Sequence, residues 1–180
     1  MSIECLQGSM FEHKQVSILV NPVNTVGVMG KGVALIFKRQ YPEMFKAYQK
    51  HCVEGFKPGQ AWVWCVPVSS SSESKTSVCW IINIATKQHW RDPSKPAWVK
   101  RGLFELQKIL KKLPENECIA LPALGCGEGG LSFEQVKKWA YAALSDVPQQ
   151  ILLFEPHPIS PRQTKSSDSI VPSIHKSSHK

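Results

Sequence analysis

The sequence predicts one layered α/β domain with a mixed, largely parallel central sheet of about six strands. Three observations support this prediction. Short runs rich in valine, isoleucine, tryptophan and cysteine alternate along the chain with segments of helical periodicity. Such alternation is typical of a parallel sheet covered by helices. The length of 180 residues fits one domain with its own core and leaves no room for a second full domain.

Six apolar runs of β type are expected to form the strands. They are residues 2–6, 17–20, 61–66, 78–84, 117–121 and 150–154. The polar segment 69–77, SSSSESKTS, joins the third run to the fourth. It is expected to be a solvated hairpin tip.

Four segments between these runs are expected to form helices, at about 32–40, 42–54, 96–113 and from 132 onward. The first helix should stop at Tyr41, because the residue before a proline is disfavoured in the α region. Val99, Leu103 and the leucines that follow recur at spacings of three and four, which predicts one apolar stripe. Ser132 and Gln135 have the spacing of a capping box at the start of the last helix.

Composition divides the chain near Pro156. Residues 1–155 are expected to fold, whereas residues 156–180 contain four prolines and seven serines and are expected to be a disordered or surface-draped basic tail. The net charge of +8 favours phosphate-bearing partners, although a basic, solvated surface explains it equally well. No run approaches the ~20 apolar residues that span a bilayer. We therefore expect a location in the cytoplasm, or in the nucleus of a eukaryote, without a membrane partner. A monomer is expected as well.

The six cysteines do not form a recognisable metal-binding or disulfide pattern. No CxxC pair is present, and no cluster of cysteine, histidine and carboxylate residues has metal-ligand spacing. Cys5, Cys65, Cys79 and Cys118 fall within apolar runs. They are expected to be buried, reduced thiols, and the sequence predicts neither a metal nor a cofactor.

Two glycine-rich loops are the strongest functional signal from the residues themselves. The segment 21–39, NPVNTVGVMGKGVALIFKR, and the segment 121–133, LPALGCGEGGLSF, each follow a predicted strand and open a predicted helix. Ligands of α/β sheets bind beyond the carboxyl ends of the strands, where main-chain N–H groups and a helix N-terminus favour negative charge. Either loop alone is also explained by ordinary turn glycines. Together they predict a site that grips a phosphorylated ligand from two sides.

The two loops and the segment 86–90, TKQHW, resemble the macrodomain family. The resemblance covers about residues 1–155, and the first loop, running through GKG, resembles the branch of DarG-like DNA ADP-ribosylglycohydrolases, which is related to the terminal ADP-ribose protein glycohydrolase. It implies a three-layer α/β/α sandwich with ADP-ribose in a cleft at the strand ends. It also implies removal of mono-ADP-ribose from nucleobases in DNA, through a thymine-type linkage.

The resemblance also assigns roles to individual residues. Lys87 matches the catalytic lysine of this branch, and Asn24 is expected to position the linkage. His89 and Trp90 are expected to lie beneath the modified base, although Trp90 packing on the helix after Pro96 remains an alternative. The residues implied to bind ADP-ribose are Gly8, Ser9, Met10, Asn21, Gly30, Lys31, Gly32, Val33, Leu124, Gly125, Cys126, Gly127, Glu128, Gly129, Gly130 and Phe154.

A lysine nucleophile requires an unusual environment. An amine that attacks the anomeric carbon C1″ divides one difficult displacement into two steps through a covalent intermediate. A lysine of ordinary pKa near 10.4 is almost wholly protonated and cannot attack. The apolar residues before Lys87, together with His89 and Arg91 after it, are candidates for lowering its pKa by burial and by positive charge.

Two departures from the family pattern bear on specificity. Ser9 stands where many macrodomains have an aspartate that accepts a hydrogen bond from adenine, and a neutral acceptor forms a weaker bond. The second loop has Glu128 followed by two glycines, which is closer to the DNA-directed branch than to the protein-directed one. ADP-ribosylated DNA is therefore expected over ADP-ribosylated protein. Release of ADP-ribose from acidic side chains, and binding of ADP-ribose without cleavage, remain the alternatives.

Overall fold

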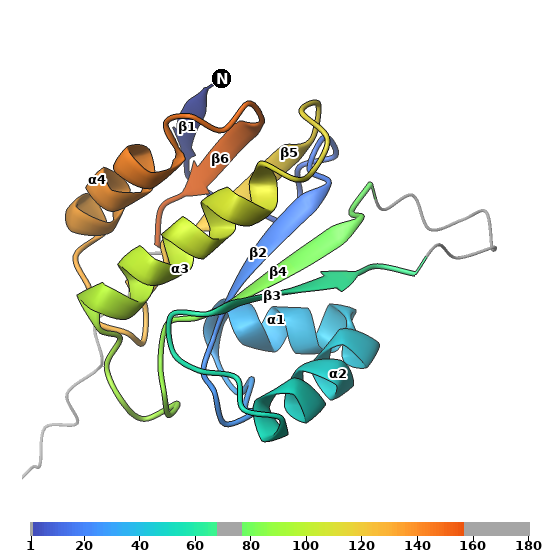
Figure 1. Cartoon of the computed structure of the whole chain (residues 1–180), viewed down its shortest axis with the longest axis vertical. Coiled ribbons are helices and arrows are strands. Elements are labelled where there is room, and N and C mark those ends of the chain that lie inside the picture. The colour runs from blue at the N-terminus through green and yellow to red at the C-terminus, as the bar shows by residue number, and fades with distance from the viewer. Residues whose placement is uncertain (1, 68–76, 157–180) are drawn as a thin grey trace, which may run out of the picture.

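The computed structural model describes residues 2–67 and 77–156. Their sheet has the order β1-β6-β5-β2-β4-β3, in which only the β3 and β4 pair is antiparallel (Figure 1). The strands are β1 (Ile3–Leu6), β2 (Ile18–Val23), β3 (Ala61–Cys65), β4 (Trp80–Ala85), β5 (Cys118–Pro122) and β6 (Gln150–Phe154). The helices are α1 (Gly32–Gln40), α2 (Pro42–Val53), α3 (Pro96–Leu110) and α4 (Phe133–Leu144). The predicted mixed, largely parallel sheet is therefore confirmed.

Helices cover both faces of this sheet, as Figure 1 shows. Alternate strand residues separate into two apolar clusters, because successive side chains of a strand point to opposite faces. Val20 and Ile82 pack with the stripe of α3 and α4, whereas Leu19 and Ile81 pack with Phe37 of α1 and with α2. The result is the three-layer α/β/α sandwich implied by the sequence resemblance.

Strand direction brings the loops that follow β2, β4 and β5 to the same end of the sheet, the end where the parallel strands have their carboxyl termini. β2, β4, β5 and β6 run parallel to one another. The loops that follow β2, β4 and β5 therefore emerge at the same edge, seen at the bottom of Figure 1. Each of these loops then opens a helix, namely α1, α3 and α4.

Helix α3 ends three residues before the predicted boundary at residue 113. The side-chain amide of Gln149 is fully buried and donates to the carbonyl oxygens of Leu110 (2.8 Å), Leu113 (3.2 Å) and Pro114 (3.1 Å). These bonds satisfy terminal carbonyl groups that would otherwise lack a partner. Pro114 has no N–H with which to continue the helix.

The predicted capping box of α4 is wrong. Ser132 is the N-cap residue with extended backbone angles, but its hydroxyl makes no capping hydrogen bond. The helix is held instead by its apolar stripe of Val136, Ala140 and Leu144, each of which is fully buried. Tertiary packing therefore fixes this helix start without the local cap.

The cysteines are all free, but their burial differs from the prediction. Cys118 is buried and Cys5 is half-buried, whereas Cys65 and Cys79 are exposed. Cys65 ends the edge strand β3, and Cys79 precedes β4 beside it, so neither thiol is covered by the layers of the sandwich. The predicted hairpin tip and the tail after Pro156 lie outside the described residues, apart from Ser77.

The described portion of the chain also lacks two further features. None of its helices has the length and apolar composition needed to cross a membrane. Within residues 2–67 and 77–156, no group of three histidine, cysteine or carboxylate side chains is arranged to hold a metal ion.

Candidate functional site

Loop one, residues 24–31, is organised around the side chain of Asn24. This amide is buried, and its oxygen Oδ1 accepts hydrogen bonds from the main-chain N–H groups of Val26 (3.1 Å) and Val28 (3.3 Å). Its nitrogen Nδ2 donates to the carbonyl oxygen of Val28 at 2.6 Å. The structure therefore places the Asn24 amide inside the loop, where it fixes the main chain, and does not direct it toward a ligand.

Tyr48 of α2 supports this arrangement from below. Its hydroxyl donates to the carbonyl oxygen of Asn24 at 2.7 Å and lies 3.0 Å from Asn24 Oδ1. Burial is the main cause of its raised pKa, so the hydroxyl keeps its proton and remains a donor. Gly27 has a positive φ of 78° and passes over Gln49 of the same helix. Loop one therefore rests on α2, while Gly30, Lys31 and Gly32 at its end are exposed.

Loop two, residues 123–132, folds over Ser94. Gly125 has a φ of 73°, and a Cβ atom there would lie 2.9 Å from the Leu131 side chain and 3.0 Å from the Ser94 side chain. A Cβ atom on Gly129 would lie 2.3 Å from Ser94 Oγ and 2.4 Å from the Gly125 carbonyl oxygen. No side chain fits at position 129 without displacing main chain. Gly127, Glu128 and Gly130 are exposed, so this loop presents main chain to solvent.

The third segment of the site is the β4–α3 loop, residues 86–95, which joins the other two loops. Thr25 of loop one donates to the carbonyl oxygen of Gln88 through both its N–H (3.1 Å) and its hydroxyl (2.9 Å). At the other end, the N–H of Ser94 donates to the carbonyl oxygen of Gly129 in loop two at 3.0 Å. The three loops therefore form one connected rim at the carboxyl edge of the sheet.

Lys87 lies in this third segment, two residues after the end of β4. Its ammonium nitrogen Nζ is 2.7 Å from the carbonyl oxygen of Glu128 and 3.5 Å from that of Trp90. Both acceptors are main-chain groups, one in loop two and one in the lysine's own loop. The half-buried side chain therefore reaches across to loop two.

The environment of Lys87 lowers its pKa. Burial, which disfavours the charged ammonium, is the largest cause, and the carboxylates of Glu128 and Asp92 act in the opposite direction. His89 and Arg91, which the sequence suggested as contributors, are not among the causes. The prediction that burial lowers the pKa of Lys87 agrees with the structure, and the prediction that neighbouring positive charge lowers it does not.

His89 and Trp90 lie together beside Lys87. Their rings stack with centroids 5.4 Å apart and an interplanar angle of 29°. The guanidinium of Arg91 lies 4.5 Å from the centre of the Trp90 ring. Trp90 is 43% exposed, so a large part of its side chain faces solvent and is not covered by packing on α3.

Ser9, at the position that contacts adenine in many macrodomains, lies with Met10 after β1 and beside Phe154 at the end of β6, a residue implied to flank adenine. Ser9 follows Gly8, whose φ is 103°, and its hydroxyl accepts a hydrogen bond from the N–H of Phe11 at 3.3 Å. Met10 and Phe154 are buried, and the Phe154 ring packs edge-on against His13 with centroids 5.0 Å apart. The structure therefore places these two side chains in the core beneath the expected adenine position, with little surface left for stacking.

Asn21 lies deeper than the other expected ligand-binding residues. It is fully buried and pairs in register with Asn83 of β4, to whose Oδ1 its Nδ2 donates at 2.9 Å. Asn21 Oδ1 and Asn83 Nδ2 are buried without a partner among the described residues. The pair lies under loop one beside Met29, from which the Asn21 amide is 4.0 Å away. Val33 of α1 is half-buried above the same cluster.

Leu124 and Cys126 complete the expected set in loop two. Leu124 is fully buried in the core, so it anchors the loop. Burial raises the pKa of the Cys126 thiol to about 11, which leaves it protonated at neutral pH. Cys126 therefore does not supply a thiolate nucleophile, and Lys87 is the nucleophile candidate that lies within the rim.

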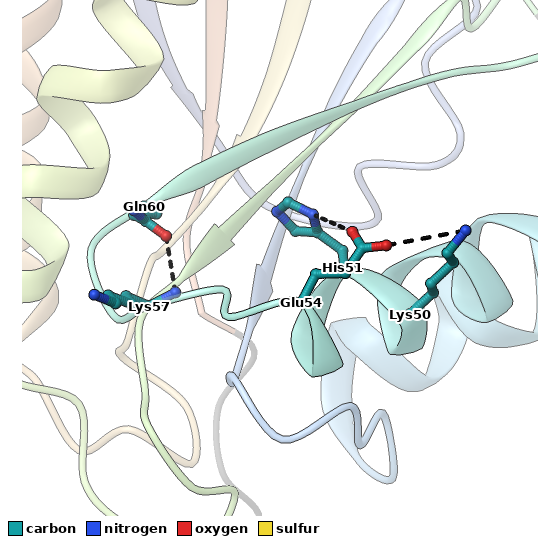
Figure 2. A network of polar contacts seen from close by, with 5 residues as sticks. All are labelled: Lys50, His51, Glu54, Lys57 and Gln60. Atoms are coloured by element: carbon teal, nitrogen blue, oxygen red, sulfur yellow. Dashed lines mark hydrogen bonds and ion pairs between the residues drawn. The ribbon is translucent and has the colours of Figure 1, made fainter.

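A separate hollow of about 280 Å³ lies beside the edge strand β3. It is lined by residues of α2, β3 and α3 and of the segment before β3, namely His51, Phe56, Gln60, Ala61, Trp62, Arg101 and Glu105. Figure 2 shows polar contacts around it, including His51 with Glu54 and the N–H of Lys57 with Gln60. None of the lining residues belongs to the three loops of the rim, so this hollow is distinct from the candidate site.

Comparison with known proteins agrees with this geometry. A sequence model of the Macro domain family matches residues 20–140, which is more than half of the chain. The chain belongs to the macrodomain family. This macrodomain therefore has its two glycine-rich loops at the edge of the sheet that the resemblance had implied.

Several relatives of this macrodomain have been described. A protein of Mycobacterium tuberculosis named DNA ADP-ribosyl glycohydrolase is 44% identical over 130 residues, which are 72% of this chain and 35% of that protein. The solved macrodomain of Thermus aquaticus DarG is 39% identical, has a TM-score of 0.75, and is matched over 86% of this chain and 99% of its own. The solved Thermosipho africanus DarTG in complex with ADP-ribose is 28% identical, with a TM-score of 0.76, over 87% of this chain and 43% of its own.

The chain covers only part of the length of the curated relatives that it matches. It spans about a third of the length of the mycobacterial protein. The similarity therefore establishes the domain and its fold, and the functions in those names belong to longer proteins.

Two supporting residues of the site were not predicted from the sequence. Tyr48 fixes loop one and Ser94 lies beneath loop two, yet each is distant along the chain from the loop it supports. Gly125 and Gly129, four residues apart, were a signal that loop two packs closely on something. The identity of that neighbour is visible only in three dimensions.

Proposed function

We propose that this macrodomain is an ADP-ribosylglycohydrolase that removes mono-ADP-ribose from a nucleobase in DNA, through a thymine-type linkage, with Lys87 as the nucleophile. The observation that carries the proposal is the position of Lys87 Nζ, 2.7 Å from a main-chain carbonyl of the glycine-rich loop two. Relatives at 39–44% identity bear the names DNA ADP-ribosyl glycohydrolase and DarG. One more distant relative was solved with ADP-ribose bound.

The rim supplies the groups that a diphosphate needs. Exposed main chain at Gly30, Lys31 and Gly32 leads into the N-terminus of α1, where N–H groups lack partners within the helix and favour negative charge. Loop two presents main chain at Gly127 and Gly130 on the other side. We therefore place the diphosphate between loops one and two, with adenine toward Gly8 and Ser9 and the distal ribose toward Lys87.

The two carbonyl contacts orient Lys87 for attack. An amine has two N–H groups and one lone pair, and carbonyl oxygens of Glu128 and Trp90 accept the two N–H groups. The lone pair of the neutral amine then points to the remaining tetrahedral position, which is where C1″ must lie. Because both acceptors are main-chain atoms, this orientation is built into the loops.

The reaction then proceeds in two steps. The neutral amine of Lys87 forms a bond to C1″ while the bond from C1″ to the base nitrogen breaks; the electron pair goes to the base, which takes up a proton. The lysine nitrogen loses a proton, giving a glycosyl-lysine or its ring-opened Schiff base. Water then adds at C1″, which releases ADP-ribose and restores the free amine. No metal or cofactor is needed for either step.

Asn24 has a different role in this proposal from the one the sequence suggested. Its amide is occupied by loop one, so it positions the main chain around the ligand and does not contact the linkage. Trp90 is exposed beside Lys87, and we propose that its ring, backed by His89, stacks on the base that carries the ADP-ribose. In proteins that bind single strands, stacking of one base on an aromatic side chain contributes about 1–3 kcal/mol to the binding free energy.

The test compares the wild-type protein with Lys87→Ala and Lys87→Arg on an ADP-ribosylated single-stranded oligonucleotide. We expect release of ADP-ribose by the wild type, its loss in both variants, and unchanged affinity of Lys87→Ala for free ADP-ribose. Lys112→Ala, an exposed lysine beyond the end of α3, is the control for charge and should retain activity. Turnover by Lys87→Ala at the wild-type rate would refute the nucleophile assignment.

A second substrate separates this proposal from its alternatives. A protein that carries ADP-ribose on an acidic side chain is offered to the same enzyme under the same conditions. Faster release from protein than from DNA would favour the protein-directed activity. Tight binding of ADP-ribose without release from either substrate would leave only a binding module.

A further inference from the structure

Two pairs of a cation and an aromatic ring, each with an exposed cation, follow Lys87 in the chain. The guanidinium of Arg91 lies 4.5 Å from the Trp90 ring centre, and Lys95 Nζ lies 4.6 Å from the ring centre of Trp98. Arg91 and Lys95 are exposed, and Trp98 is half-buried at the first turn of α3. Neither cation has a carboxylate partner within the described part of the chain.

Positive charge is concentrated in this part of the chain. Residues 87–101 contain five lysine or arginine residues and one acidic residue, Asp92. This segment of fifteen residues therefore carries a formal charge of +4, half of the +8 of the whole chain. Lys100 lies over Trp139 and Arg101 lines the separate hollow beside β3, so the rim segment 86–95 itself carries a formal charge of +2 from Lys87, Arg91, Lys95 and Asp92. This charge attracts a polyanion to the mouth of the proposed active site.

The pairs are held firmly relative to Lys87. The carbonyl of Trp90 itself accepts from Lys87 Nζ at 3.5 Å. Between the two pairs, the N–H of buried Ser94 is bonded to Gly129 of loop two, and the N–H of Trp98 is bonded to the carbonyl of Lys95 at 3.0 Å. The surface that carries both rings therefore adjoins the rim that holds the nucleophile.

We propose that the surface formed by Trp90, Arg91, Lys95 and Trp98 binds the unmodified nucleotides next to the ADP-ribosylated base. This inference rests on the proposed function and specifies the partner of the same site. Lys95, whose Nζ lies 4.6 Å from the Trp98 ring centre, turns to a phosphate when a neighbouring base stacks on that ring, and Arg91 pairs with the phosphate beside the modified base. A platform of aromatic rings with interleaved cations is the arrangement by which proteins hold single strands.

The surface selects for a single strand. Tryptophan rings stack only on bases whose faces are free, and the faces of bases in a duplex are already stacked on one another. Arg91 and Lys95 lie between Trp90 and Trp98 in the chain, so cationic and aromatic side chains interleave. Duplex DNA offers phosphates and base edges but no free base faces, so only Arg91 and Lys95 of this surface would hold it.

The experiment compares two substrates that share the same linkage. One is an ADP-ribosylated thymidine nucleoside, and the other is a short single-stranded oligonucleotide ADP-ribosylated at one central thymine. We expect Trp98→Ala and Lys95→Glu each to lower kcat/KM for the oligonucleotide about tenfold and to leave kcat/KM for the nucleoside unchanged. Phe104→Ala removes another exposed aromatic of α3, and Lys38→Ala removes a cation from the opposite layer; both should match the wild type.

Equal activity of wild type and Trp98→Ala on the oligonucleotide would overturn the surface and leave the proposed function intact. A wild type that acts equally well on nucleoside, single strand and duplex would also overturn it. Failure of the wild type to release ADP-ribose from any substrate would instead refute the proposed function. The surface is then tested by the affinity of the protein for an unmodified single strand, measured at several salt concentrations. In Lys95→Ala, the slope of log K against log salt concentration should become less steep by about 0.7, as expected for the loss of one phosphate contact.

Binding of free ADP-ribose serves as the control that the variants are correctly folded. Trp98 is half-buried, so Trp98→Ala is compared with wild type for its affinity toward free ADP-ribose. Equal affinity shows that the rim is intact in this variant. Lys95→Glu replaces an exposed side chain, so it tests the same surface without the cavity that truncation of half-buried Trp98 could leave.

Discussion

Lys87 donates a 2.7 Å hydrogen bond to the main-chain carbonyl of Glu128, although the two residues lie 41 positions apart in the chain. The bond joins the β4–α3 loop to loop two across the proposed cleft. It separates two effects of Glu128, because the main chain orients the lysine while the side-chain carboxylate raises the lysine pKa. These effects can be tested independently, since a substitution removes the carboxylate and keeps the carbonyl.

The activity should depend on pH through Lys87. The pKa of this lysine is lowered from 10.5, chiefly by burial, and the neutral amine is the reactive form. The fraction of neutral amine grows as the pH rises toward the folded-state pKa. We expect kcat/KM to rise with pH along a limb whose midpoint lies below 10.5. A rate that is flat or falls over this range would contradict a lysine nucleophile.

Glu128→Gln should move that limb to lower pH. The carboxylate stabilises the ammonium form of Lys87, so its removal lowers the lysine pKa further and yields neutral amine at a lower pH. The measurement is the pH profile of kcat/KM, with Glu115→Gln, an exposed carboxylate between α3 and β5, as the control. If Glu128 serves as an acid or base, the plateau rate itself will fall and the limb will not move in this way.

The fold was accessible from the sequence because it depends on local periodicity. The apolar runs of β2 and β4, which are buried on both faces of the sheet, and the stripe of Val99, Leu103 and Leu106 in α3 are visible in the sequence alone. Exposure of Cys65 was not visible, because a run such as AWVWC has the same composition at an edge as in the centre of a sheet. Edge position is a property of topology.

The site was accessible only in outline. The two glycine-rich loops indicated a phosphate-binding site, and the resemblance pointed to Lys87. The role of Asn24 was not accessible, because the Tyr48 hydroxyl that holds it comes from a helix 24 residues further along the chain. An asparagine that fixes its own loop and one that binds a ligand have the same sequence context. Only the partners of the amide distinguish them.

Gly129→Ala should damage loop two. The added Cβ atom would lie 2.3 Å from Ser94 Oγ and 2.4 Å from the Gly125 carbonyl oxygen, so the main chain must move. We expect a loss of about 1–3 kcal/mol in the free energy of unfolding, as for other overpacked sites, and a clear loss of ADP-ribose affinity. Thermal unfolding and calorimetric titration with ADP-ribose measure these effects.

Gly127→Ala is the matched control for stability. No atom lies within 4 Å of a Cβ atom built at Gly127, and its φ is not positive. Its unfolding temperature should equal that of the wild type. Removal of the Ser94 side chain should not rescue Gly129→Ala, because the Gly125 carbonyl remains in place. Full recovery of Gly129→Ala by Ser94→Gly would show that the serine alone determines the loop.

Ser9→Asp should strengthen the binding of ADP-ribose. The Ser9 hydroxyl accepts from the N–H of Phe11 at 3.3 Å, and a carboxylate can accept the same bond with one oxygen and leave the other for the adenine amino group. Charge-assisted hydrogen bonds are roughly twice as strong as neutral ones. We expect a several-fold lower Kd for ADP-ribose with no change for ribose 5-phosphate, which lacks adenine. An equal change for both ligands would show that adenine does not lie near Ser9.

Tyr48→Phe should loosen loop one and leave the reacting groups in place. The variant removes the hydroxyl that bonds the Asn24 carbonyl at 2.7 Å and lies 3.0 Å from Asn24 Oδ1, while the buried ring remains. A buried acceptor that loses its partner costs about 1–3 kcal/mol, so the free energy of unfolding should fall by that amount. The Kd for ADP-ribose should rise several-fold, because the main chain from Gly27 to Lys31 becomes less fixed. Chemical denaturation and calorimetric titration measure the two effects.

Tyr141→Phe is the control for the loss of a tyrosine hydroxyl. Tyr141 is 41% exposed on α4, and its hydroxyl bonds the Ile3 carbonyl at 3.2 Å, away from the three loops of the rim. Water can replace this bond at an exposed site, so stability should change little and ADP-ribose affinity should not change. If Tyr48→Phe binds ADP-ribose as tightly as Tyr141→Phe while unfolding more easily, then Tyr48 stabilises the domain without shaping the ligand site. The Asn24 network would in that case be a structural feature of loop one alone.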